Sequence, residues 1–231
     1  KKLPHVLIVV HFAGHPCDLK EIYKLSRIYK FKIIEDASHA LGSIYLNSKI
    51  GSCRYSDITV FSFHPVKMIT TGEGGAATCN DRYLYAKLKS YRSHGIIYLN
   101  KEKNRPWMFY QKYLGFNYRL NDIQASLGIS QLNRLKIFIK KRNSIAKFYN
   151  KKLKNLPFQL PEVDTKCLST FHLYVVLIKK NKKKINRDTF YKKLLKKKIK
   201  LNIHYIPIYR HPYFKKLGFN NNKFQNNEVY F

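Results

Sequence analysis

The chain has 231 residues, 45% of them hydrophobic and 15% aromatic, so it can bury a sizeable core and is not a disordered chain. Its formal net charge of +32 invites a nucleic-acid interpretation, but lysine far outnumbers arginine, and Lys, Asn, Ile, Tyr and Phe, residues of adenine- and thymine-rich codons, are abundant together. Codon bias therefore accounts for the charge, leaving weak non-specific affinity for polyanions and no specific nucleic acid as partner.

The amino-terminal part of the chain alternates between predicted strands and helices. Leu3–Val10 is an apolar strand that leads into the turn HFAGHP. Asp18 and Glu21 have the spacing of a capping box and predict a helix that runs to about Tyr29. A second short strand, Phe31–Ile34, then leads into the acidic pair Glu35–Asp36.

The next elements repeat this alternation. Asp57–Phe63 is a third apolar strand that ends at His64–Pro65, and a GEGG turn, a short AATC strand and a helix over about 81–90 follow. Strands alternating with helices predict an α/β domain in layers around a mostly parallel sheet. Ligands of such sheets bind beyond the carboxyl ends of the strands, where both Asp36 and Lys67 are expected.

The second half of the chain is predicted to be mostly helical at first. After a looser segment over 91–117, a long helical pattern runs from Asn121 to about Leu153. A strand candidate, Phe171–Ile178, a lysine-rich helix and the apolar segment Leu201–Ile206 form a smaller α+β lobe. We therefore expect a large domain over 1–134 and a small carboxy-terminal lobe over 135–231.

The cysteines and histidines do not predict a structural metal or a disulfide framework. The four cysteines form no C-x-x-C pair, which is typical of a protein of the reducing cytoplasm. His11, His15 and Cys17 are close in sequence, but Pro16 prevents the helix that would align them, and no second ligand pair follows. No apolar run is long enough to cross a membrane.

One lysine has the setting of a reactive amine. Lys67 follows a buried strand and the turn at His64–Pro65 and precedes a glycine-rich loop, so its amine projects from a fixed base. A lysine in a partly dry pocket loses its proton readily and becomes a nucleophile toward aldehydes. Asp36 on the same rim offers a partner for a ring nitrogen, and Ser62 a hydroxyl for a phosphate. Pyridoxal 5'-phosphate requires these three functions, although the spacing alone leaves a surface lysine as the plainer alternative.

Three longer motifs sharpen this interpretation. EDASHALGS (35–43), SDITVFSFHPVKMITTGEGGAATCND (56–81) and GFNYRLNDIQASLGISQL (115–132) resemble the DegT/StrS-type sugar aminotransferases, in the same order and over nearly the whole chain. The resemblance implies a fold-type I, pyridoxal-phosphate-dependent enzyme. The form FSFHPVK-x-ITTGEGG is most similar to the branch that aminates position four of a sugar, and in particular to the pseudaminic-acid pathway transaminases.

The resemblance also implies roles for individual residues. Lys67 matches the lysine that bonds covalently to the cofactor, Asp36 the partner of the pyridine nitrogen, and His39 a position beside the cofactor ring. Ser62 matches a phosphate ligand, and Asn117 matches an asparagine that reaches the phosphate of the neighbouring subunit, which implies a homodimer with shared active sites. Two further residues resemble parts of the substrate entrance, with ion-pair or packing roles as alternatives: Arg119 and His204.

The implied reaction is the transamination of a nucleotide-linked, for example UDP-linked, 4-keto-6-deoxy sugar for surface or flagellar glycans, with L-glutamate as amino donor. The chain departs from the family at its start, where more than a hundred residues of the family's amino-terminal part are missing. We therefore expect an incomplete large domain with an open flank beside the site. Two rival functions remain: a cofactor-binding regulator without turnover, and a polyanion-binding basic domain.

Overall fold

The computed structural model describes residues 3–98, 105, 107–179, 186–219 and 224. The chain divides into two compact units, Lys1–Leu177 and Ile178–Phe231, and each is described by itself. The predicted domain boundary after residue 134 falls inside the first unit, between two of its helices, and stays a prediction about the complete protein.

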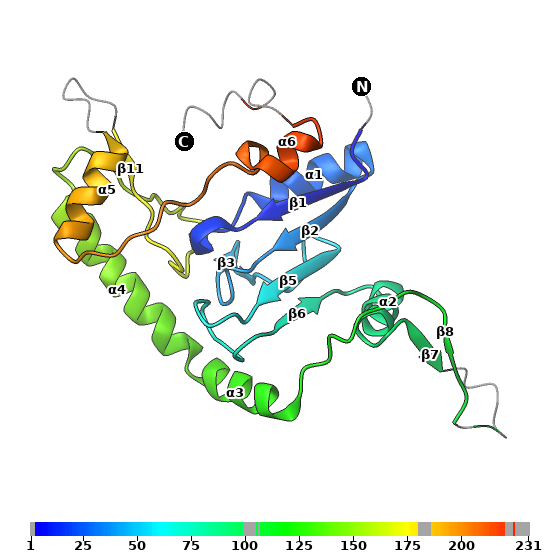
Figure 1. Cartoon of the computed structure of the whole chain (residues 1–231). Coiled ribbons are helices and arrows are strands. Elements are labelled where there is room, and N and C mark those ends of the chain that lie inside the picture. Colours follow the sequence, from blue (N-terminus) through cyan, green and yellow to red (C-terminus); the bar gives the residue numbers. More distant parts are fainter. Residues whose placement is uncertain (1–2, 99–104, 106, 180–185, 220–223, 225–231) are drawn as a thin grey trace. The chain divides into compact units, whose positions relative to one another are not determined.

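A four-stranded sheet forms the centre of the first unit (Figure 1). Strands β1 (Val6–Val10), β2 (Lys32–Asp36) and β5 (Ile58–Ser62) run parallel, and β6 (Gly75–Thr78) pairs antiparallel with β5 at one edge. The strand order is β1-β2-β5-β6. The predicted α/β architecture with a mostly parallel sheet is therefore confirmed.

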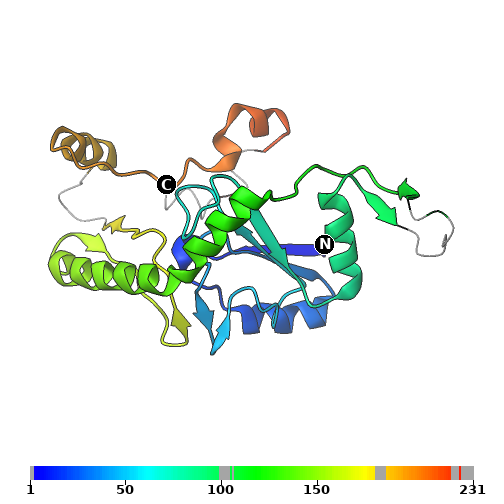
Figure 2. The same ribbon diagram turned by 90° about the horizontal axis from the view of Figure 1, so that it is seen from below.

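The two faces of this sheet have different environments. Helix α1 (Leu19–Tyr29) covers one face of the sheet (Figure 2). Val9 and Ile33 point to this face, where they are 7% and 1% exposed. The alternate residues Val6, Ile8 and Val10 point to the other face and are 46%, 61% and 49% exposed. Parallel sheets normally have both faces covered. The open flank expected from the sequence is thus present as an exposed apolar face.

Helix α1 begins where the sequence predicts, but the predicted capping box is wrong. Asp18 is the N-cap residue, yet it makes no side-chain bond to the helix among the described residues. Its Oδ1 accepts a hydrogen bond from the hydroxyl of Tyr45 instead, and Glu21 pairs with Lys24 at 2.7 Å. The buried tyrosine takes the carboxylate because a phenol removed from water needs an acceptor.

The predicted long helix after residue 121 is two helices. Helix α3 (Asp122–Asn133) begins with a capping box formed by Asn121 and Gln124, and helix α4 (Leu135–Leu153) starts after a break at Arg134. Helix α2 (Arg82–Arg92) is capped by Asp81, whose carboxylate accepts from the backbone N–H of Leu84 at 2.8 Å.

The remaining strands of the first unit are short. In the looser segment over 91–117, β7 (Ile96–Tyr98) and β8 (Phe109–Gln111) form an antiparallel pair. A second small sheet has the order β10-β3-β4, formed by Cys167–Leu168, Ile44–Tyr45 and Ser48–Lys49. Strand β9 spans Phe158–Gln159.

A buried set of hydrogen bonds joins the start of the first unit to its end. The hydroxyl of Ser43 donates to the carbonyl oxygen of Gly14 at 2.7 Å, and the hydroxyl of Thr170 donates to the carbonyl of His39 at 3.0 Å. Gly14 has a φ of +93°, and a Cβ there would lie 2.3 Å from Oγ1 of Thr170. Only glycine fits this position, so the turn after β1 is built for close contact with residue 170.

The second unit contains the end of β11 (Leu177–Ile178), helix α5 (Arg187–Lys196), a 3-10 turn η2 (Ile208–Arg210) and helix α6 (Pro212–Lys216). Helix α5 is the lysine-rich helix predicted from the sequence, and Leu201–Ile206 forms neither a helix nor a strand. Of the strand candidate Phe171–Ile178, only the last two residues form a strand. Among the described residues, no helix is both long and apolar enough to span a bilayer.

Candidate active site

The strand register brings two predicted site residues to the same edge of the sheet. Asp36 is the last residue of β2 and pairs with Val60 of β5, two residues before Ser62. Register partners on neighbouring strands share a face, so Asp36 and Ser62 lie on the same, open face. Strand spacing and rise put their Cα atoms roughly 8 Å apart. This is the edge where ligands of parallel sheets bind.

Asp36 keeps one carboxylate oxygen available. Its Oδ1 accepts a hydrogen bond from the backbone N–H of Ser38 at 3.0 Å, and its Oδ2 has no hydrogen-bond donor among the described residues. The side chain is half-buried. The local turn therefore fixes the carboxylate at the strand end while leaving an acceptor for a ligand.

Lys67 lies in a turn that its neighbours hold firmly. Its backbone N–H donates to the carbonyl of His64 at 2.9 Å, and the N–H of Thr71 donates to the carbonyl of Phe63 at 3.0 Å. Met68 and Ile69, the next two residues, are each 4% exposed and anchor the turn. Lys67 itself is half-buried, and no carboxylate of the described residues lies within 4.0 Å of its amine.

Ser62 and His64 shape the entrance to this turn. The backbone N–H of His64 donates to Oγ of Ser62 at 3.4 Å, and Nδ1 of His64 accepts from the N–H of Val66 at 3.3 Å. The hydroxyl proton of Ser62 has no acceptor in the described part of the chain. His64 therefore helps to shape the turn, and Ser62 can still donate to an anion.

His39 lies three residues after Asp36 and is 9% exposed. Its Nδ1 accepts from the backbone N–H of Ala13 at 3.3 Å, and its ring centre lies 4.5 Å from that of His172 and 5.9 Å from that of Phe12. Arg142 supports the far side, donating to the carbonyl of His172 at 3.0 Å, and burial lowers the pKa of its guanidinium. The His39 ring is thus fixed close to the sheet edge.

Asn117 and Arg119 form a separate group. The guanidinium of Arg119 donates to Oδ1 of Asn117 at 3.1 Å and lies 3.4 Å from Nε2 of His94. Both residues are exposed, and no hydrogen bond or ion pair between described residues joins them to Asp36, Ser62 or Lys67. The structure therefore brings Asn117 and Arg119 together with each other and not with the lysine site.

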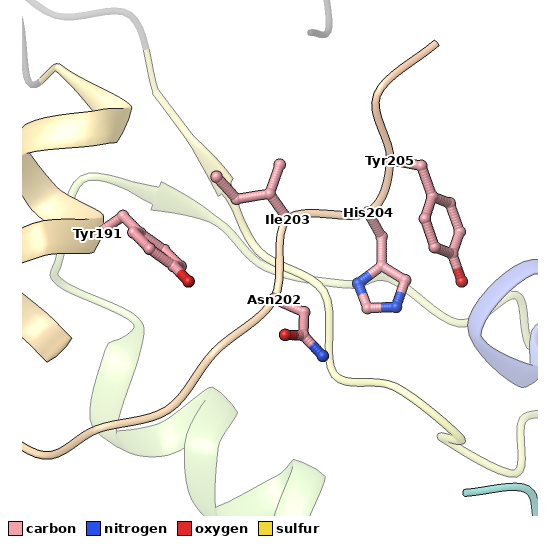
Figure 3. Close-up of a pocket in the computed structure, with 5 residues that line it drawn as sticks. All are labelled: Tyr191, Asn202, Ile203, His204 and Tyr205. Carbon is pink, nitrogen blue, oxygen red and sulfur yellow. The ribbon is translucent and has the colours of Figure 1, made fainter. Parts of the chain in front are cut away.

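His204 belongs to the second unit. It lines a cavity of about 430 Å³ together with Tyr191, Asn202, Ile203 and Tyr205 (Figure 3). The side chains of Asn202 and His204 extend to the same side of their segment, and Tyr191 faces them from helix α5. Two phenol rings beside an amide and an imidazole offer both apolar faces and hydrogen-bonding groups, as sugar ligands require.

The sequence did not reveal a buried polar network on the covered face. The backbone N–H of Cys17 donates to Nδ1 of His11 at 3.1 Å, so the Nε2–H of His11 donates to Glu35 at 2.8 Å. Glu35 also accepts from the hydroxyls of Ser56 and Thr59. His11, Glu35 and Thr59 are at most 1% exposed. The sequence does contain a signal for this pair: His11 comes directly after an apolar strand, and Glu35 lies near the end of the next one.

Comparison with known proteins identifies the family. A model of the DegT/DnrJ/EryC1/StrS aminotransferase family matches residues 3–231. The chain belongs to this family. It is 40% identical over 210 residues to a UDP-4-amino-4,6-dideoxy-N-acetyl-beta-L-altrosamine transaminase of Campylobacter jejuni, covering 90% of this chain and 54% of the relative. The resemblance seen in the three motifs is therefore confirmed.

Solved structures of aminotransferases have the same fold. The Helicobacter pylori aminotransferase PseC, involved in the biosynthesis of pseudoaminic acid, superposes with a TM-score of 0.80 at 35% identity, over 91% of this chain and 55% of that one. The pyridoxal-phosphate form of a sugar aminotransferase, Spr1654 of Streptococcus pneumoniae, gives 0.85 at 26% identity, over 98% and 61%. The chain thus spans little more than half the length of its relatives and has an aminotransferase fold over that part.

Proposed function

We propose that this chain is the lysine-bearing part of a pyridoxal-phosphate-dependent aminotransferase that acts on a nucleotide-linked 4-keto-6-deoxy sugar. The observation that supports this most is the juxtaposition of Asp36 and Ser62 at the carboxyl ends of adjacent parallel strands, with Lys67 in the fixed turn that follows. The named sugar transaminases among the relatives support the reaction class.

The residues at the sheet edge fit the cofactor. The Oδ2 oxygen of Asp36 can accept from a protonated ring nitrogen, the hydroxyl of Ser62 can donate to a phosphate oxygen, and the amine of Lys67 has no competing carboxylate among the described residues. His39 would lie beside the ring, and Asn117 would contribute to the phosphate site of a second subunit. Pyridoxal phosphate, when bound, supplies an electron sink for the carbanion that transamination requires.

Two of these residues, Lys67 and Asp36, would take part directly in the reaction. The Nζ atom of Lys67, in a half-buried position, would act as the base that takes the proton from the substrate carbon and as the acid that delivers it to the cofactor carbon. The carboxylate of Asp36 would stabilise the positive charge of the protonated ring nitrogen. This charge would favour loss of the proton from the substrate carbon.

The partners follow from the same proposal. L-glutamate is the proposed amino donor, and the free thiols of all four cysteines support a cytoplasmic location. A homodimer is supported by the exposed large apolar residues of the β7–β8 pair and helix α3, a type of surface that other chains commonly cover. The most exposed of these are Tyr98, Phe109, Ile123 and Ile129.

The substrate is proposed to be a UDP-linked 4-keto-6-deoxy-N-acetylhexosamine, used for surface or flagellar glycans. The cavity around His204 supports a role for the second unit in binding the sugar, since it combines aromatic faces with an amide and an imidazole. Arg119, whose guanidinium is exposed, is the proposed contact for a charged part of the substrate.

Chemical trapping on the complete polypeptide tests the proposal. The protein is incubated with pyridoxal phosphate, reduced with borohydride and digested, and mass spectrometry locates the cofactor. We expect the label on Lys67, its loss in Lys67→Ala, and retention in the control Lys49→Ala, which removes an exposed lysine of β4. Labelling spread over many lysines, unchanged in Lys67→Ala, would refute the assignment.

A second measurement separates an enzyme from a cofactor-binding regulator. Glutamate and then a 4-keto nucleotide sugar are added to the loaded protein, and amino-sugar formation is followed by mass spectrometry. Specific labelling of Lys67 without any amino sugar formed would support the regulator and contradict turnover.

A further inference from the structure

A second concave site lies at the opposite ends of the strands. A cavity of about 470 Å³ opens where β2 and β5 begin and α1 ends, in the first unit. Its rim includes Lys32, the first residue of β2, and the rise along this strand places Lys32 roughly 13 Å from Asp36. The cavity is therefore distinct from the candidate active site. Its cationic lining residues are Arg27, Lys30, Lys32 and Arg54, and its remaining ones are Tyr23, Ser26, Phe31, Cys53, Ser56 and Asp57.

The charges around this cavity do not cancel. Asp57 is its one lining carboxylate, and both of its oxygens are occupied: Oδ1 pairs with Nζ of Lys32 and Oδ2 accepts from the N–H of Ile33, each at 2.9 Å. Asp81 lies close enough to act electrostatically on Lys32, whose pKa is raised mainly by its hydrogen bond with Asp57. Glu35, which accepts a hydrogen bond from the lining residue Ser56, is a third carboxylate beside the cavity, and four cationic side chains stand against these three.

Three of these cations lack a carboxylate partner in the part of the chain that the structure describes. No carboxylate of the described residues lies within ion-pair distance of Arg27, Lys30 or Arg54. The carboxyl end of α1, which ends at Tyr29, contributes a partial negative charge of about half a unit. Arg27, in the last turn, offsets that charge, and Lys30 and Arg54 are two further cations beside the helix end.

Neighbouring groups orient two of the four cations, all of which are exposed at the rim of the cavity. The guanidinium of Arg54 lies over the ring of Tyr55, 5.3 Å from its centre, and Lys32 is oriented by Asp57. Lys30 occupies the left-handed C-cap position of α1 with a φ of +56°, which directs the chain away from the helix at this point. The floor is partly buried, with Ser26 and Cys53 at 6% and 7% exposed. Cations from α1, β2 and the loop before β5 thus surround one cavity.

We propose that this cavity binds a small phosphorylated anion, of the size of a di- or oligophosphate. A volume of about 470 Å³ exceeds what one phosphate fills and lies in the range of small-molecule sites. The three cations without a carboxylate at ion-pair distance suit the several negative charges of a diphosphate, and charge-assisted hydrogen bonds from arginine suit its oxygens. The proposal is independent of the aminotransferase function, since it uses none of the residues assigned to that site.

Isothermal titration calorimetry with inorganic pyrophosphate at 0.15 M salt tests the proposal. The chain is basic throughout, so the control must remove the same charge elsewhere. We expect one saturable site, weakened at least about tenfold in Arg27→Gln/Arg54→Gln and changed less than about twofold in Lys192→Gln/Lys196→Gln on the exposed face of α5. Equal weakening in both double variants, or binding without saturation, would show non-specific attraction and overturn the proposal.

A measurement on the unsubstituted chain covers the case in which the double variant does not fold. Lysine acetylation is followed by mass spectrometry with and without pyrophosphate. We expect slower acetylation of Lys30 and Lys32 and no change at Lys192 and Lys196. Uniform protection of all four lysines, or none, would contradict a localised site.

Discussion

Glu35 and Asp36 are consecutive residues of β2, and they have opposite environments. Glu35 points to the covered face, is 1% exposed and accepts hydrogen bonds from His11, Ser56 and Thr59. Asp36 points to the open face, where its Oδ2 receives no donor from the described residues. The comparison shows how a strand separates two roles by its alternation of side chains. One carboxylate holds the fold together, and its neighbour remains available for a ligand.

The same contrast extends to the apolar residues. On the covered face, Ile33 packs in the core with Val9, Leu19 and Tyr45. On the open face, Ile8 is an equally apolar β-branched residue that is 61% exposed. The sheet is therefore apolar on both sides, although only one side is covered in the described structure. The variants below test this difference, from the largest expected effect to the smallest.

Asp36→Ala is expected to have the largest effect, on turnover. If the carboxylate stabilises a protonated cofactor ring, its loss lowers the transamination rate of the complete enzyme by about a thousandfold or more, roughly 4 kcal/mol. Stability should fall by only about 1 kcal/mol, since one hydrogen bond to Ser38 is lost. Single-turnover kinetics and thermal unfolding measure the two effects. A near-normal rate with cofactor bound would contradict the role of Asp36.

Glu35→Ala is expected to act on stability instead. The substitution leaves His11, Ser56 and Thr59 without their shared acceptor in a buried site, which costs about 3 kcal/mol in the free energy of unfolding. Urea unfolding measures the loss, and Glu35→Gln, which keeps an acceptor oxygen, should recover part of it. A loss below about 1 kcal/mol would show that the network is not structural.

Tyr45, on the covered face, is expected to make the free energy of unfolding depend on pH. Burial, together with its hydrogen bond to Asp18, raises the pKa of this phenol to about 12, above its ordinary value of 10. The folded state therefore holds the proton more tightly than the unfolded state. The stabilisation is complete below pH 10 and is lost as the pH rises from 10 to 12. Unfolding midpoints of the chain and of Tyr45→Phe should converge over this range, and a constant difference would contradict the assignment.

Ile8→Thr is expected to have the smallest effect on stability, below about 1 kcal/mol, because the side chain is already exposed. Ile33→Ala on the covered face is the matched comparison and should cost about 3 kcal/mol. Ile8→Thr should also reduce self-association in sedimentation experiments, since it removes part of an exposed apolar face. Equal losses for the two variants would show that the open face is covered in solution.

Much of the candidate site could be predicted because its residues follow strand ends. Asp36 and Ser62 terminate two apolar runs, and parallel pairing alone brings such ends to one edge. The turn around Lys67 could also be predicted, because a proline precedes it and a glycine-rich loop follows it in the sequence. Local pattern and the general rules of α/β sheets were sufficient there.

The remaining features depend on contacts that no local pattern shows. Asp18 and Glu21 have the spacing of a capping box, but Tyr45, 27 residues away from Asp18, takes the Asp18 carboxylate. The sequence argues against a metal at His11, but it does not show the actual partner of this side chain, Glu35, which is 24 residues away. The break at Arg134 interrupts a helical pattern that contains neither glycine nor proline at that point. In each case tertiary packing decided between locally acceptable alternatives.

The hydrogen bonds around Gly14 also bear on how the chain folds during synthesis. Oγ of Ser43 lies 3.3 Å from Oγ1 of Thr170, which is 127 residues later in the chain. Closing a loop of this length is slow compared with forming helices and hairpins. The turn after β1 therefore cannot reach its final packing until residue 170 has left the ribosome. The hydrogen bond from Thr170 to the carbonyl of His39 can likewise form only after residue 170 has been synthesised.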